Sequence, residues 1–492
     1  MANLTMANPA SHNNEAPVKY KTIVYFICTV AALGGLLFGL DQGFIANSLD
    51  TIQKVYSLNV EGAEHYAAAL AWGGILGALL SGIFARFLGR KKSLIFAGFL
   101  FSACSVISAF LPPLGMLTIC RFMLGFAVGV ASFIVPLYLS ETAPVGIRGS
   151  MGTLFQLMIT LGIFLISLTN VLIAKLFTSP SMALPLMFLV IGIFALLMFL
   201  GAFILPESPR WLLLKERREE GRKVLQKTLT SENEVNFAYT EIQNTLKETK
   251  SVSNIIFKGY FLKILVVGIL LQMFQQLVGI NLMVYYSPTI FGYAGMKGFY
   301  AVMAVPTVFL IFTFPAIRLV EKLGRKKLLY IGGIMMLITM LAAGLAFLSI
   351  GNSTDSASIS AFPKAVLLIS MVIYIIGFAF TWGPVVWLMC SEIFPLEGRE
   401  VGMTITTMVN WNFAGLVMYN SLTVMKDFGN ASIFFVFAFF CLISLVFVRF
   451  LVPETKGITL EEFEADLRSG VPLRKLGTIS QNQLEPISDL TK

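Results

Sequence analysis

The pentapeptide LGRKK occurs twice in the chain, at residues 88–92 and again at residues 323–327. Two other pairs of motifs follow in the same order: SETAPVGIR (140–148) with SEIFPLEGR (391–399), and PESPR (206–210) with PETKG (453–457). The three offsets are 235, 251 and 247 residues. Ordered pairs at a nearly constant offset indicate that two structural repeats make up most of the chain.

The composition is that of a membrane protein. Of the 492 residues, 57% are hydrophobic and only 13% are charged, whereas soluble domains carry about 25% charged residues. The mean hydropathy is +0.80. The net charge of +9 is spread over short basic loops between apolar runs, not over the continuous basic face that nucleic-acid binding requires. We therefore expect contact with a lipid bilayer and none with nucleic acid.

Twelve apolar runs are each long enough to cross a bilayer as a helix, for which roughly 20 residues are needed. They are residues 22–48, 66–86, 93–111, 115–138, 151–174, 183–204, 261–291, 299–320, 327–350, 365–390, 400–425 and 431–451. We predict an all-α membrane protein with twelve transmembrane helices in two six-helix halves. The predicted parts are an N-terminal segment (1–21), a first bundle (22–205), a helical linker (206–258), a second bundle (259–452) and a C-terminal tail (453–492).

The distribution of Lys and Arg predicts the orientation of the chain. Loops 86–92 and 321–327 each carry four basic residues, whereas loops 112–114, 175–182 and 292–298 carry at most one lysine each. Because basic loops stay in the cytoplasm, we expect the linker and both termini to be cytoplasmic. The first 20 residues lack the features of a secretory signal, so the first span is expected to direct insertion.

Cysteine and histidine usage argues against a metal site or an enzyme. The five cysteines all fall inside apolar runs without metal-ligand spacing, and the only histidines are His12 and His65. The sequence contains no nucleophile–base pair, metal-binding cluster or phosphate-binding loop that would indicate a membrane enzyme. We expect no enzymatic activity, no metal and no organic cofactor.

Three amides lie close together in the seventh span: Gln275, Gln276 and Asn281. At 3.6 residues per turn they occupy adjacent faces of a helix, and a helix that faced lipid would not carry three amides. An amide both donates and accepts hydrogen bonds, as sugar hydroxyls do, and each hydroxyl taken from water needs a new partner. The amides indicate a polar cavity that suits a sugar; the alternative is hydrogen bonding between helices.

Two charged residues stand inside apolar spans of the first half. Asp41 follows nineteen uncharged residues in the first span, and Arg121 lies about two turns beyond Pro113 in the fourth. Charged groups within a membrane are costly and pair with one another. Since Asp41 is the only acidic residue in the apolar interior of this half, we expect an Asp41–Arg121 ion pair.

Charged residues recur at matched positions where the helices of both halves meet the cytoplasm. Arg–carboxylate pairs are directional and can be bidentate, so partly desolvated pairs could latch this side shut. The alternative is solvated loop charge that only sets the orientation of the chain. The residues expected to form this cytoplasmic latch are Arg90, Glu141, Arg148, Glu207, Arg210, Arg325, Glu392, Arg399 and Glu454.

Several motifs resemble, as a set, those of the sugar porter family of the major facilitator superfamily. They are PESPRWL (206–212), PETKG (453–457) and QQLVGINLMVYYSP (275–288), and the resemblance extends from about residue 20 to about residue 460. The segment CSEIFPLEGRE (390–400) is most similar to that of bacterial galactose–proton and arabinose–proton symporters. Xylose–proton symporters are somewhat more distant. The resemblance implies the major facilitator fold.

By this resemblance, the sugar-binding positions are Gln156, Gln275, Gln276, Asn281, Trp387 and Asn410. Trp382 and Trp411 are expected to shape the same cavity. Tyr285 and Tyr286 are expected to close over it from outside, although paired tyrosines are also typical of the membrane interface.

The chain departs from the family pattern at two positions. Phe309 stands in the eighth span where facilitative glucose and xylose porters have a sugar-binding Asn. Arg86 stands three residues before Gly89, where the family has an acidic residue or Asn, while the second repeat keeps Glu321. The first departure leaves one polar contact missing or replaced, and the second affects the latch in the first half.

In the symporters that the chain resembles, an Asp at the position of Asp41 and an Arg at that of Arg121 form the proton-coupling pair, whereas facilitative glucose transporters carry Asn at the first position. The resemblance implies import of a monosaccharide by alternating access, with a proton as co-substrate. Facilitative uniport and a non-transporting sugar sensor are the alternatives. The sugar is left open among galactose, glucose, arabinose and xylose, and we expect a monomer in a bacterial inner membrane.

Overall fold

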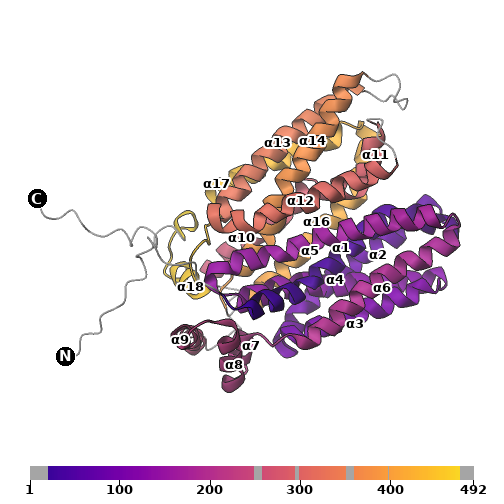
Figure 1. The fold of residues 1–492 in the computed structure, drawn as a ribbon. Coiled ribbons are helices and arrows are strands. Elements are labelled where there is room, and N and C mark those ends of the chain that lie inside the picture. The colour runs from indigo at the N-terminus through magenta and orange to yellow at the C-terminus, as the bar shows by residue number, and fades with distance from the viewer. Residues whose placement is uncertain (1–19, 249–257, 294–297, 351–359, 397, 477–492) are drawn as a thin grey trace, which may run out of the picture.

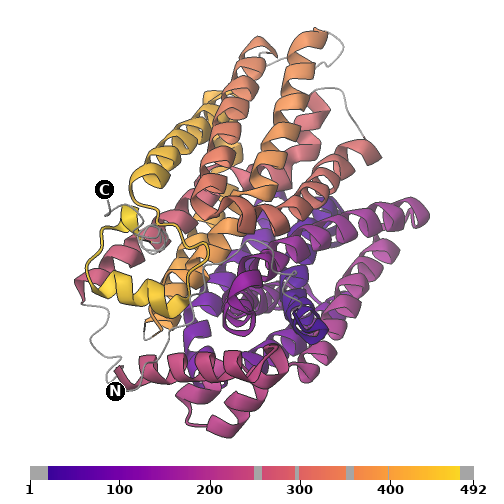
Figure 2. The ribbon, with the colours of Figure 1, turned by 60° about the vertical axis from the view of Figure 1, so that its left-hand side comes forward.

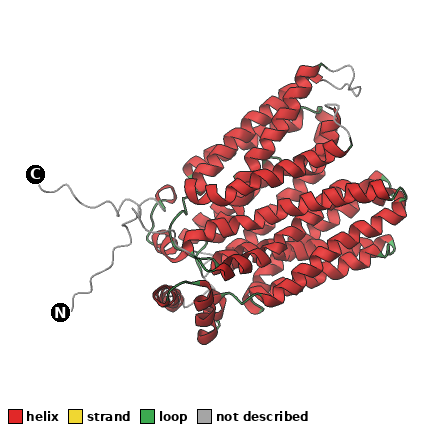
Figure 3. Cartoon of the chain, viewed as in Figure 1, coloured by secondary structure: helices red, strands yellow, loops and turns green. Residues whose placement is uncertain are grey.

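The computed structural model describes residues 20–248, 258–293, 298–350, 360–396 and 398–476. This part of the chain is helical and contains no strand (Figure 3). Its long helices form two bundles that lie side by side, the first half of the chain in indigo to magenta and the second in orange to yellow (Figure 1).

Six helices form the first bundle: α1 (Thr22–Tyr56), α2 (Val60–Phe87), α3 (Arg90–Ala109), α4 (Leu114–Thr142), α5 (Arg148–Leu176) and α6 (Pro180–Ile204). Eight form the second: α10 (Gly259–Leu277), α11 (Ile280–Tyr293), α12 (Phe299–Leu323), α13 (Arg325–Ile350), α14 (Ala361–Phe380), α15 (Trp382–Glu392), α16 (Arg399–Phe428) and α17 (Ser432–Phe450). The surplus of two arises because two of the spans are interrupted.

Eleven segments of the described chain are long and apolar enough to cross a membrane. α16 is not among them and is more polar, since it carries Asn410, Asn412 and Asn420. It nevertheless packs against α2 and α10 inside the assembly. With α16 the two halves supply six spans each.

The seventh span is broken, whereas the sequence predicts one run over 261–291. α10 ends at Leu277 and α11 begins at Ile280. Between them Gly279 has φ +100°, and a Cβ there would lie 2.6 Å from the Phe437 ring, so both conformation and space favour glycine. The Tyr374 hydroxyl donates a 3.0 Å hydrogen bond to the freed carbonyl of Val278.

The tenth span is broken as well, at Thr381, whereas the sequence predicts one run over 365–390. The first turn of α15 is bound by a side chain from the end of α10. The Gln275 amide donates to the Trp382 carbonyl at 2.9 Å and to the Gly383 carbonyl at 3.1 Å. The two breaks of the second bundle are therefore linked, and discontinuous helices of this kind are where transporters place their substrate sites.

Four shorter helices gather at one end of the two bundles: α7 (Pro209–Leu214), α8 (Arg218–Thr228), α9 (Glu232–Glu248) and α18 (Leu460–Arg468) (Figure 2). We call this the linker end. The start of α1 lies here too, because Lys21 Nζ donates to the Gln226 carbonyl of α8 at 2.6 Å. α18 begins with a capping box between Thr459 and Glu462. It stands in the segment that the sequence predicts as a polar tail.

Candidate functional site

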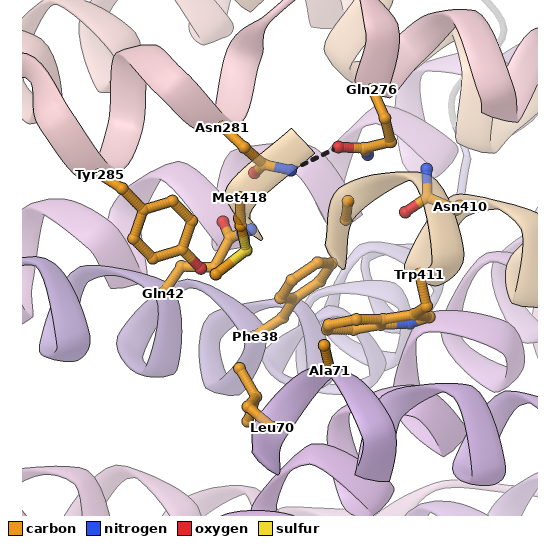
Figure 4. Close-up of a pocket in the computed structure, with 11 residues that line it drawn as sticks. Phe38, Gln42, Leu70, Ala71, Gln276, Asn281, Tyr285, Asn410, Trp411 and Met418 are labelled. Atoms are coloured by element: carbon orange, nitrogen blue, oxygen red, sulfur yellow. Dashed lines mark hydrogen bonds between the residues drawn. The ribbon is translucent and has the colours of Figure 1, made fainter. Parts of the chain in front are cut away.

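A cavity with two adjoining lobes lies between the bundles. Phe38 and Gln42 of α1 and Gln276 and Asn281 of the second half line both lobes. The first lobe is completed by Leu70, Ala71, Tyr285, Asn410, Trp411, Ala414 and Met418 (Figure 4). The second is completed by Gln156, Ile159, Gln275, Ile280, Val284, Phe309, Phe378 and Trp387. All six predicted sugar-binding residues line one lobe or both.

The amides of the second half are tied into one another. Asn410 Nδ2 donates to the side-chain oxygens of Gln272 at 2.6 Å and Gln275 at 2.8 Å. Asn281 Nδ2 donates to Gln276 Oε1 at 2.7 Å. These bonds orient the amides before any ligand arrives. Gln272 was not among the predicted site residues, although its place one turn before Gln275 and Gln276 could have indicated it.

Aromatic side chains cover the apolar parts of the cavity. The Trp387 ring lies edge-on to Phe155, with centroids 5.5 Å apart, and the Trp411 ring lies 5.2 Å from Phe38. Trp411 Nε1 donates to Ser132 Oγ at 3.3 Å, so it also links the two halves. Aromatic faces of this kind can cover the C–H surface of a sugar.

One of the predicted cavity residues, Trp382, is placed differently. Trp382 lines neither lobe: it is fully buried, and its Nε1 donates to the Leu329 carbonyl at 2.9 Å. It therefore anchors the start of α15 to α13. Tyr285 lines the first lobe, while the side chain of Tyr286 lies outside the described part of the structure.

Asp41 and Arg121 form an ion pair between α1 and α4, and both side chains are buried. The Arg121 guanidinium also lies 5.8 Å from the centre of the Tyr66 ring. Asp41 Oδ2 and Arg121 Nε have no hydrogen-bond partner among the described residues. The pair is thus removed from water and keeps one unused acceptor and one unused donor. Asp41 is followed in α1 by Gln42, which lines the cavity.

At the linker end, each half contains the same bidentate pair. Arg90 contacts both carboxylate oxygens of Glu141, at 2.9 and 2.8 Å, and Arg325 contacts those of Glu392, at 3.2 and 2.9 Å. These pairs join α3 to α4 and α13 to α15. They stabilise each bundle internally and do not bridge the two bundles.

Glu207 and Glu454 accept hydrogen bonds from backbone N–H groups. Glu207 accepts from the backbone N–H groups of Arg90 and Lys91, at 2.8 and 3.2 Å, and Glu454 accepts from those of Arg325 and Lys326, at 2.9 and 3.1 Å. Carboxylates at helix N-termini satisfy unpaired donors and the helix dipole. Burial raises the pKa of Glu207, against the opposing effect of these donors.

Contacts at the linker end join the two bundles to each other, and another contact joins the linker to the segment after the second bundle. Arg90 Nη1 lies 3.2 Å from Glu400 of α16. Glu321 Oε1 accepts from the Ser150 backbone N–H of α5 at 3.1 Å. Arg210 of α7 pairs with Glu461 of α18 at 2.7 Å. Glu400 and Glu461 were not among the predicted latch residues. Glu400 gives Arg90 a second carboxylate partner besides Glu141. This partner is present although Arg86 stands where the family has an acidic residue or Asn.

Arg148 and Arg399 differ from the expected carboxylate pairing. Among the described residues neither has a carboxylate within 4 Å, and Arg399 Nε instead donates to the Phe394 carbonyl at 3.2 Å. Both lie near Arg210, with Glu461 facing the cluster. Burial by itself would raise the pKa of Glu461, but Arg210, Arg399 and Arg148 together lower it to about 2.

A twelve-span bundle of two repeats, with a polar cavity between them, is the architecture of a membrane transporter. The family model of the sugar (and other) transporters matches residues 27–467, and the chain belongs to this family. It is 38% identical to a galactose-proton symporter of Escherichia coli K12 over 463 residues, which cover 93% of this chain and 97% of that protein. It is 35% identical to an arabinose-proton symporter of the same strain over 462 residues, covering 92% and 95%.

Among solved structures, the chain is similar to the proton:xylose symporter XylE bound to 6-bromo-6-deoxy-D-glucose. The TM-score is 0.82 at 31% identity, and the match covers 90% of this chain and 98% of XylE. The predicted membership of the sugar porters, and with it the twelve-helix major facilitator fold, is confirmed.

Proposed function

We propose that the protein imports a monosaccharide together with a proton. The observation that carries this proposal is the buried Asp41–Arg121 pair next to a cavity lined with amides and tryptophans. A neutral sugar finds hydrogen-bond partners in the amides, while the carboxylate offers a site for one proton. The names of the related symporters support the same reaction for this chain.

Protonation of Asp41 would neutralise a buried carboxylate and weaken its attraction to Arg121. The two halves could then rock around the cavity, because a ligand or proton that binds one conformation better shifts the population toward it. A proton entering down 100 mV supplies about 2.3 kcal/mol, which sustains a sugar gradient of roughly forty-fold.

The contacts at the linker end fit a cytoplasmic latch that is closed in this conformation. Arg90–Glu400 and Ser150–Glu321 join the two bundles there, and Arg210–Glu461 joins the linker to the segment after the second bundle. Under the positive-inside rule this end faces the cytoplasm, with both termini on that side. Opening toward the cytoplasm would require these contacts to break.

The remaining features of the proposal follow from the sugar porter family. The domains are a bundle at 22–205 and a bundle at 259–452, joined by the linker at 206–258 and flanked by 1–21 and 453–492. The protein acts as a monomer in a bacterial inner membrane, without nucleic acid, metal or organic cofactor. It moves its substrate chemically unchanged, as a carrier does and an enzyme does not.

The test is uptake into proteoliposomes that contain the purified protein. Galactose, glucose, arabinose and xylose are offered under an imposed inward proton gradient, with and without a protonophore. We expect at least one sugar to accumulate above its outside concentration, and the protonophore to abolish this accumulation. Equilibration that ignores the protonophore would identify a uniporter, and an absence of counterflow for every sugar would identify a sensor.

A further inference from the structure

We propose that Gln42 is a sugar-binding residue that sets sugar specificity, and that it supplies from the first half the polar contact that Phe309 does not provide. This inference rests on the proposed function and deepens it. It adds to the site a residue that the motifs do not single out.

Gln42 belongs to the cavity wall that the first half contributes. It is half-buried, and it is one of the four residues in the described part of the chain that line both lobes of the cavity. Its side chain extends from α1 on the side of the pocket where Tyr285 and Met418 lie (Figure 4). A molecule in either lobe would therefore meet this side chain.

The amide of Gln42 is available to a ligand. Among the described residues its side chain makes no hydrogen bond, whereas the amides across the cavity bond to one another, as Asn281 does to Gln276 at 2.7 Å. An amide offers two donors and a carbonyl acceptor. The second half thus presents a preformed polar wall, and Gln42 faces it with its whole hydrogen-bonding capacity unused.

Phe309 makes one wall of the second lobe apolar. Its ring is buried and packs edge-on against Phe378, with centroids 5.9 Å apart. A sugar hydroxyl that faced Phe309 would lose its water without gaining a partner. Gln42 lines the same lobe and can form a hydrogen bond with a sugar hydroxyl there. The polar contact that Phe309 does not provide from the second half would then come from Gln42 in the first half.

Gln42 also directly follows Asp41 on α1, about 100° away around the helix. α1 packs so closely on α5 that a Cβ at Gly39 would lie 1.9 Å from the Ile159 carbonyl oxygen. Asp41 and Gln42 are neighbours in one hydrogen-bonded helix, so their backbones shift together. A shift of α1 when Asp41 changes its charge would therefore reposition Gln42 against the sugar.

The test uses the full-length protein in proteoliposomes, with the sugar that it transports and the set of deoxy analogues of that sugar. Gln42→Leu should raise KM about three- to ten-fold, the value of one hydrogen bond, with the maximal rate within about two-fold of the wild type. The wild type should discriminate against one deoxy analogue, and Gln42→Leu should lose that discrimination. Gln42→Asn, which keeps a shorter amide, should fall between them.

Gln53→Leu is the matched control, since Gln53 lies three turns further along α1 and lines neither lobe. It should leave KM and the analogue pattern unchanged. Adding Phe309→Asn to Gln42→Leu should restore part of the lost affinity. A Gln42→Leu protein with the KM and analogue pattern of the wild type overturns the inference. A wild type that transports no sugar overturns the proposed function instead.

Discussion

Arg90 and Glu400 belong to different halves of the protein, and their Nη1 and Oε1 atoms lie 3.2 Å apart. Among the described residues, this is the one ion pair that joins the two transmembrane bundles directly. Arg90 is held in place by its bidentate contact with Glu141. The second half can therefore dock on a preoriented guanidinium.

Glu400→Gln should shift the protein toward the conformation that is open at the linker end. The pair is partly exposed, so its loss should cost about 0.2 to 1 kcal/mol, or up to about five-fold in population. The measurement is the labelling rate of Leu388→Cys by an impermeant maleimide, because Leu388 packs against Gly152 between the halves. Glu220→Gln, which breaks the exposed Arg217–Glu220 pair at the start of α8, is the control and should not change labelling. Equal labelling rates would mean that the pair does not hold the halves together.

Asp41→Asn should abolish accumulation while sugar exchange continues. The variant removes the titratable carboxylate but keeps a polar group beside Arg121. Under 100 mV the accumulation ratio should fall from roughly forty-fold to about one. Counterflow without a gradient should stay within about ten-fold of the wild type. If this variant still concentrates sugar at acidic outside pH, the proton site lies elsewhere.

Glu461→Gln should lower the free energy of unfolding by as much as about 3 kcal/mol, since it leaves buried guanidinium groups without their carboxylate. The pKa of Glu461 is lowered to about 2, below the ordinary value of about 4.3. Its stabilising contribution is therefore complete above about pH 4.3 and is lost as the pH falls toward 2. Thermal unfolding in detergent should show the same difference between variant and wild type at about pH 7 and about pH 5. Asp466→Asn on the same helix is the control, and a difference that already shrinks by pH 5 would contradict the lowered pKa.

Gly279→Ala should destabilise the break between α10 and α11. A side chain at positive φ costs about 1 to 2 kcal/mol, and the added Cβ would meet the Phe437 ring at 2.6 Å. We expect a lower unfolding temperature and a higher KM, because the break positions Gln276 and Asn281 on its two sides. Gly259→Ala is the matched control, since a Cβ there meets nothing within 4 Å. Equal effects of the two substitutions would argue against a special role of the break.

Much of the site could be anticipated from residue chemistry. Amides and charges are so costly in lipid that Gln275, Asn281, Asp41 and Arg121 had to lie in the protein interior. Gln42 could have been predicted in the same way, because it is a polar residue inside an apolar run. It was not singled out, since the charge of the adjacent Asp41 is the more unusual feature. The direction of the Trp382 side chain could not be predicted from its position in the motif. Trp382 stands beside cavity residues in sequence, yet it faces α13.

The sequence by itself determined the two repeats, the number of spans and the membrane class, because burial in lipid demands long apolar runs and a helix satisfies its own backbone. Only the tertiary structure decided where the spans break and which arginines Glu400 and Glu461 bind. It also decided that Gln42 faces the cavity with a free amide. These features depend on contacts between residues far apart in the chain, such as Tyr374 with Val278 and Arg90 with Glu400. Periodicity and composition report local preferences, and such contacts form only when the helices pack.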